Sequence, residues 1–97
     1  METYLIFRRN GWLTATELQD AADRSTAEEE RMSEEVRWIR SYVITERDGT
    51  AGTICVYQAM SPEAIRRHAD RADLPIDEIV QVADTVIVRA DPVRIAT

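Results

Sequence analysis

The sequence predicts an α+β domain whose elements follow the order strand, helix, strand, strand, helix, strand. Two β-rich runs, VRWIRSYVIT and TICVYQAM, flank the turn residues 47–50, which is the pattern of a β-hairpin. A capped helix opens after the hairpin at Ser61-Pro62, and a last strand begins at Glu78 within EIVQVADTVIV. One strand and one helix precede the hairpin, so the full order is βαββαβ.

The first strand and helix are marked by their boundaries. TYLIFRR, residues 3–9, has the composition of a buried strand, and we expect Asn10-Gly11 to end it in a turn. Thr14 with Glu17 three residues later is a capping box, so the first helix begins at about Thr14 and runs to about Ser33. Its last turns are rich in glutamate; a solvated face explains this better than a carboxylate metal site.

The second helix has a clear start and a clear core stripe. Ser61 is the predicted N-cap, and Pro62 occupies the first helical position, where its missing N–H is not needed. Ile65, Ala69 and Ala72 recur at helical spacing and predict the buried face, with His68 at its edge.

Two right-handed crossovers joined by the hairpin predict a ferredoxin-like domain: a four-stranded antiparallel sheet with the first and third strands central and both helices on one face. We expect a single domain over residues 1–97, with its core in residues 3–88 and a C-terminal tail in residues 89–97. Strict alternation along the second strand places Ile39 and Val43 on one face of the sheet. The residues on the other face are Val36, Trp38, Tyr42 and Ile44.

The strands are apolar on both faces, although two helices can cover only one of them. A second subunit covering the other face would avoid a large exposed apolar surface. The sequence therefore predicts a homodimer of the dimeric α+β-barrel type. It does not say which face forms the interface.

Composition excludes several classes of partner. A net charge of −6 and a pI of about 4.7 argue against nucleic acid and against anionic membranes, which bind basic surfaces. The single Cys allows no internal disulfide. No apolar run reaches the ~18 residues that a membrane span needs, and no secretory leader is visible. We therefore expect a soluble, cytoplasmic protein.

Two segments of this chain, VRWIRSYV and ICVYQAMSPEAIRRHADRADLPIDEIVQV, resemble a small bacterial family known as domain of unknown function 4242. The similarity covers residues 3–82 and is carried by Trp38, Ser41, Tyr42, the Cys-x-Tyr run at Cys55 and the helix with His68. It implies a ferredoxin-like fold, a dimeric α+β barrel and nickel binding.

The nickel ligands that the resemblance implies are incomplete here. Metal-linked members carry a His pair four apart on the second helix, where this chain has His68 and Ala72. They also carry an acidic residue where Gln58 stands, and a His where Arg8 and Arg9 end the first strand. His68 and Cys55 are the metal ligand candidates that remain.

An aromatic pocket is the alternative to a metal site. Its candidate residues surround Arg40, which would clamp an anionic ligand; they are Tyr4, Trp38, Tyr42, Tyr57 and His68. A dimer interface explains the same residues slightly better, because Trp, Tyr and Arg are enriched there.

The functional hypotheses come from three classes. The first is a homodimeric ligand-binding or metal-binding protein. The second, by fold analogy alone, is a cofactor-independent monooxygenase or isomerase with His68 or Tyr57 as acid–base. The third is an interaction module without chemistry of its own. No pattern identifies catalytic residues, and no Gly-rich phosphate loop is present.

Overall fold

The computed structural model describes residues 1–93. Its elements run in the predicted order βαββαβ, so the predicted α+β class is confirmed. They are β1 (Glu2–Trp12), α1 (Ala15–Arg31), β2 (Val36–Thr45), β3 (Ala51–Ala59), α2 (Pro62–Ala72) and β4 (Glu78–Gln81).

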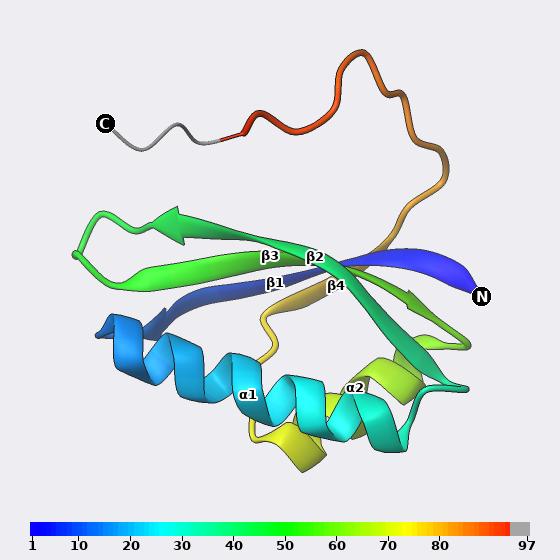
Figure 1. Cartoon of the computed structure of the whole chain (residues 1–97), viewed down its shortest axis with the longest axis horizontal. Helices are drawn as coiled ribbons and strands as arrows, with labels where there is room; N and C mark the ends of the chain where they lie inside the picture. Colours follow the sequence, from blue (N-terminus) through cyan, green and yellow to red (C-terminus); the bar gives the residue numbers. More distant parts are fainter. Residues whose placement is uncertain (94–97) are drawn as a thin grey trace.

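The four strands form one antiparallel sheet in the order β2-β3-β1-β4, so β1 and β3 are central as predicted. Both helices cover one face of this sheet, which we call the helix face (Figure 1). Figure 1 shows no helix on the other face, which we call the open face. Neither helix in residues 1–93 has the length and apolar character needed to cross a membrane.

The helix starts agree with the capping prediction. Thr14 caps α1 and forms the capping box with Glu17, and Ser61 caps α2 with Pro62 in its first turn. The core stripe of α2 is buried as predicted, and His68 belongs to it, with 1 % of its surface exposed rather than lying at its edge. The core therefore lies between α2, the end of α1 and the helix face.

Asn10-Gly11 does not end the first strand, contrary to our prediction. The pairing of β1 with β3 shifts register after Arg8 and resumes where Trp12 lies opposite Ala51. Asn10 has a φ of 51°, a left-handed conformation that Asn tolerates better than most residues. Asn10-Gly11 therefore forms part of a bulge within the strand rather than a turn at its end. The strand continues beyond it and brings Trp12 to the helix face.

A second irregularity lies in β2 and overturns the predicted strand faces. Trp38 pairs with Tyr57, but Arg40 pairs with the next residue of β3, Val56, so Ile39 is an extra residue on this strand. A β-bulge of this kind reverses the alternation beyond it. Tyr42 therefore does not share a face with Trp38. The helix-face residues of β2 are Val36, Trp38, Ser41 and Val43, and those of the open face beyond the bulge are Arg40, Tyr42 and Ile44.

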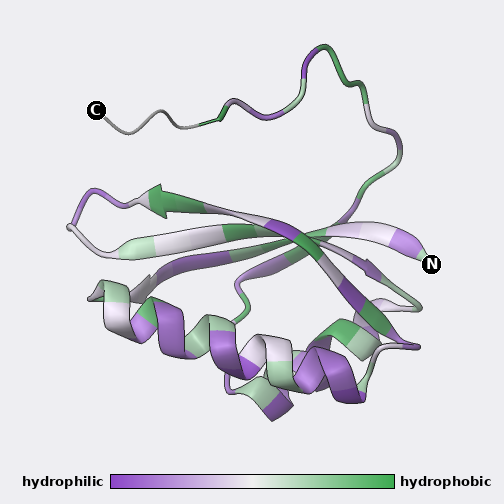
Figure 2. Cartoon of the chain, viewed as in Figure 1, coloured by the Kyte–Doolittle hydropathy of each residue, from purple (hydrophilic) through white to green (hydrophobic). Residues whose placement is uncertain are grey.

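The segment after β4 crosses to the open-face side of the sheet (Figure 1). Residues 82–93 contain no helix or strand. Asp91 anchors the segment by accepting hydrogen bonds from Arg40 Nη1 at 2.7 Å and from the Tyr42 hydroxyl at 3.0 Å. Figure 2 shows hydrophobic residues in this segment and near the end of β2. The last part of the predicted tail, residues 94–97, lies outside the described residues.

Candidate ligand-binding site

A cavity of about 400 Å³ lies between the helix face and the first half of α1. Both tryptophans of the chain line it, Trp12 from the end of β1 and Trp38 from β2. Tyr57 of β3 and Leu18 of α1 add apolar wall. A small apolar cavity with a few polar groups is the usual form of a site for small organic molecules.

The bulge in β2 shapes the wall of this cavity. Because Ile39 is extra, Trp38 and Ser41 lie on the same face although they are three residues apart. The Trp38 indole Nε1 donates to Ser41 Oγ at 2.7 Å, and its ring stacks on Tyr57 with centroids 6.2 Å apart and planes 10° apart. Glu29 of α1 accepts the backbone N–H of Trp38 at 2.7 Å. These contacts fix the Trp38 ring as a flat side of the cavity.

Arg8 is the charged residue of the cavity, and its side chain is fully buried, with 2 % of the residue exposed. It lies on the helix face of the central strand β1, opposite Thr53. Its Nη1 donates to Cys55 Sγ at 3.1 Å, whereas Nε and Nη2 have no hydrogen-bond partner among the described residues. A buried guanidinium with two unpartnered nitrogens is rare in a folded core.

Sequence reasoning considered Arg8 only as a residue unable to ligate a metal. Strand alternation could have identified it, since Arg8 shares the helix face with Tyr4 and Ile6. Trp12 was missed because the strand was expected to end at Asn10. Ser25 was missed as a contact residue because its role depends on tertiary packing.

Ser25 of α1 lines the cavity and links α1 to β3 and to α2. Its hydroxyl shares a hydrogen bond of 2.9 Å with the Tyr57 hydroxyl, and its backbone carbonyl accepts from His68 Nε2 at 3.0 Å. Burial raises the pKa of Tyr57 to about 12, although the Ser25 hydrogen bond and the Arg8 charge act in the opposite direction. Burial lowers the pKa of His68. Both groups are therefore uncharged at neutral pH.

The structure separates the predicted site residues into three places. Trp38, Tyr57 and Cys55 line the cavity. Two others lie in the core and do not line it; they are Tyr4 and His68. The remaining two lie on the open face, where they bind Asp91; they are Arg40 and Tyr42. The predicted clamp needs Arg40 on the same face as Trp38, and the bulge at Ile39 places the two residues on opposite faces of the sheet.

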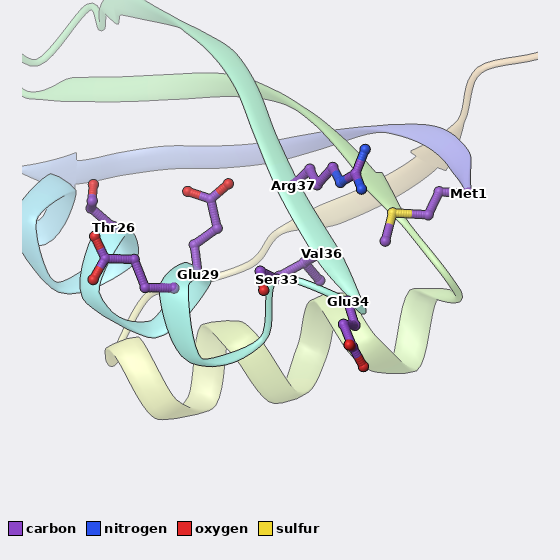
Figure 3. Close-up of a pocket in the computed structure, with 8 residues that line it drawn as sticks. Met1, Thr26, Glu29, Ser33, Glu34, Val36 and Arg37 are labelled. Carbon is purple, nitrogen blue, oxygen red and sulfur yellow. The ribbon is translucent and has the colours of Figure 1, made fainter.

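A second hollow, of about 620 Å³, lies between the end of α1 and the start of β2. Three of the acidic residues at the end of α1 and beyond line it, namely Glu29, Glu30 and Glu34. Figure 3 shows Glu29 pointing towards the sheet and Glu34 pointing away from it, with Arg37 nearby. The Glu29 carboxylate accepts a hydrogen bond from the backbone N–H of Trp38. Glu30 and Glu34 are exposed, whereas Glu28, Glu29 and Glu35 are half-buried, so a solvated face describes only part of this group.

The metal candidates do not form a nickel site within one chain. Among residues 1–93, no group of three or more His, Cys, Asp or Glu side chains could hold a metal ion. Cys55 Sγ lies 3.1 Å from the Arg8 guanidinium, whose permanent charge repels a divalent cation. His68 Nε2 is hydrogen-bonded to the Ser25 carbonyl, and Nδ1 has no partner; the residue is 1 % exposed and belongs to no group of three or more potential ligands in residues 1–93. These residues do not fit the ion.

Comparison with known proteins gives the family. No curated protein sequence matches this chain. A solved structure, "Crystal structure analysis of SCO4226 from Streptomyces coelicolor A3(2)", is 22 % identical with a TM-score of 0.69, and the alignment covers 87 % of this chain and 99 % of that one. At this identity the likeness establishes the fold.

A family model described as "Nickel responsive protein SCO4226-like" matches residues 4–82. The predicted resemblance to a nickel-linked family is confirmed to that extent, whereas the name domain of unknown function 4242 does not appear in the match. Because the match spans most of the sequence, the chain belongs to the SCO4226-like family of nickel responsive proteins.

Proposed function

We propose that this protein binds a small organic molecule in the cavity between α1 and the helix face. The observation that carries the proposal is the cavity itself: about 400 Å³ of mostly apolar space, with Trp12, Trp38 and Tyr57 in its wall, in a chain of 97 residues. Small cores are normally packed without voids of this size. Space of this kind is retained where a ligand fills it.

Binding is favoured over catalysis because the two acid–base candidates are poorly placed. His68 does not line the cavity and is hydrogen-bonded to the Ser25 carbonyl. Tyr57 does line it, but its hydroxyl is engaged by Ser25 and its pKa is raised to about 12. A general acid or base works best with a pKa near the operating pH.

The family name raises nickel as the alternative ligand. The lack of fit at Cys55 and His68 supports an organic ligand over a nickel ion in the single chain. A nickel site that needs residues from two chains is compatible with the family name, and calorimetric titration of the protein with nickel would detect it.

We further propose that the protein is a cytoplasmic homodimer in which a second copy covers the open face. The open face contains half-buried apolar side chains on both central strands, and Tyr42 on the edge strand β2 is 44 % exposed. The half-buried residues are Leu5, Phe7, Ile54 and Val56. A sheet that has apolar residues on both faces is typical of one buried on both. The lone, buried Cys55 is compatible with a reducing compartment.

The binding proposal is tested by intrinsic fluorescence, because both tryptophans line the cavity. Titration with a panel of single-ring aromatic acids, amides and alcohols should change the emission saturably. Ala22→Leu, which fills the cavity from α1, should weaken binding. Ala27→Leu, on the exposed side of the same helix, is the matched control and should bind as the parent does. Absence of saturable binding up to millimolar concentration overturns the proposal.

A further inference from the structure

Arg8 has no counter-ion within the described part of the chain. The ion pairs in residues 1–93 involve other arginines, namely Arg9, Arg31, Arg40 and Arg67. The guanidinium of arginine is effectively always charged in proteins. A buried charge without a partner is strongly unfavourable. An anion in the cavity is the group that would remove this penalty.

The polar groups around Arg8 are already committed, which leaves one edge of the guanidinium free. Cys55 Sγ accepts from Nη1, Ser25 Oγ bonds the Tyr57 hydroxyl, and Ser41 Oγ accepts from Trp38. In residues 1–93 the buried side-chain atoms without a partner are Nε and Nη2 of Arg8 and Nδ1 of His68, and of these two residues only Arg8 lines the cavity. The two Arg8 nitrogens form the side edge of the guanidinium, and their N–H bonds are parallel. Two parallel donors match the two oxygens of a carboxylate.

Building on the proposed function, we infer that the cavity ligand is a small organic monocarboxylate whose carboxylate binds the Nε/Nη2 edge of Arg8. The stacked rings of Trp38 and Tyr57 form a flat apolar wall. Trp12 and Leu18 also line the cavity. The body of the ligand is therefore a single aromatic ring or a branched aliphatic chain of similar size.

A single negative charge fits better than a phosphate. A phosphate group has more acceptor oxygens and more charge than one guanidinium edge can satisfy, and Arg8 is the cation that lines the cavity. The whole chain has a net charge of −6, so its long-range field does not concentrate multivalent anions. The attraction is local to Arg8, whose buried charge is screened less by salt than a surface charge would be.

The experiment compares acids with their neutral amides. Benzoate and benzamide, and phenylacetate and phenylacetamide, are titrated by tryptophan fluorescence and calorimetry into the parent, Arg8→Met and Arg66→Met. Arg66→Met is the matched control, because it removes the same side chain from an exposed position of α2 that takes part in none of the ion pairs in residues 1–93. We expect the acids to bind the parent and Arg66→Met at least about tenfold more tightly than the amides, and the preference to vanish in Arg8→Met.

Each other outcome overturns a defined claim. Equal binding of acids and amides by the parent overturns the carboxylate inference and leaves the proposed function standing. A preference for acids that survives in Arg8→Met overturns the role of Arg8. Stabilisation by chloride or inorganic phosphate as strong as that by the acids overturns the organic carboxylate class. Absence of any binding overturns both proposals.

Discussion

Replacing Arg8 with Met is expected to stabilise the protein when no ligand is present. The substitution removes one hydrogen bond, from Nη1 to the weakly accepting Cys55 sulfur, a loss of about 1 kcal/mol. It also removes two buried nitrogens that lack partners, Nε and Nη2, at about 1–3 kcal/mol each. The methionine fills less of the cavity, which reduces the gain. The free energy of unfolding should therefore rise by roughly 1–4 kcal/mol.

Urea denaturation at fixed protein concentration measures this change, and the melting temperature should rise by about 4–8 °C per kcal/mol in a domain of this size. Arg66→Met is again the control. Its side chain is exposed on α2 and takes part in none of the ion pairs in residues 1–93, so its removal should change stability by at most about 0.5 kcal/mol.

When a carboxylate that binds is added, the parent should become more stable than Arg8→Met. Ligand at a hundred times its dissociation constant stabilises the parent by about 2.7 kcal/mol and gives Arg8→Met no such gain. The reasoning is refuted if Arg8→Met is less stable than the parent by more than about 1 kcal/mol without ligand. Arg8 would then be a structural residue that supports the fold through Cys55.

Four further results are expected. Because the pKa of His68 is lowered in the folded state from 6.5, the unfolded chain takes up a proton first on acidification, so stability should fall as the pH drops below 6.5, by at most about 1.4 kcal/mol per pH unit. This slope should be missing in His68→Gln, and identical slopes would contradict the assignment. Calorimetric titration of nickel should show no submicromolar binding, and tight binding that persists in His68→Ala would point to ligands outside the predicted set. Light scattering should give the mass of two chains, and Phe7→Glu on the open face should yield monomers; a one-chain mass for the parent at micromolar concentration rules out the dimer. Deletion of Ile39 should leave the protein folded and able to bind ligand, because it removes the extra residue and leaves every other residue of β2 on its present face. Deletion of Val43 should destabilise the protein, because it moves neighbouring residues of β2 to the opposite face; an equal loss of stability in both variants would refute the role of the bulge.

The order of elements could be predicted because it depends on local signals. The capping box at Thr14, the Ser61-Pro62 start and the hairpin turn around Gly49 each act within a few residues of chain, and the structure contains all three. The central positions of β1 and β3 follow from handedness and connection length. These features need no knowledge of distant side chains.

The candidate site could be predicted only in part, because two bulges decide which residues reach it. Alternation correctly places Val36 and Trp38 on one face of the strand and fails one residue later, at Ile39. The bulge after Arg8 has a local sequence signal, Asn10-Gly11, and Asn10 adopts a positive φ in the structure. The same dipeptide is also typical of ordinary turns, so the sequence does not distinguish a turn from a bulge. Bulges depend on the pairing between strands, which one strand's sequence does not specify.

The bulge at Ile39 decides which residues of β2 reach each face of the sheet. Before it, Val36 and Trp38 lie on the helix face; beyond it, Ser41 and Val43 take that face, and Arg40 and Tyr42 lie on the open face, where they bind Asp91. A regular strand would have placed Arg40 on the same face as Trp38, and thus a second cation on the side where Arg8 is buried. Two like charges in one buried site repel strongly. The bulge therefore leaves Arg8 as the single cation lining the cavity, which suits a ligand with one negative charge.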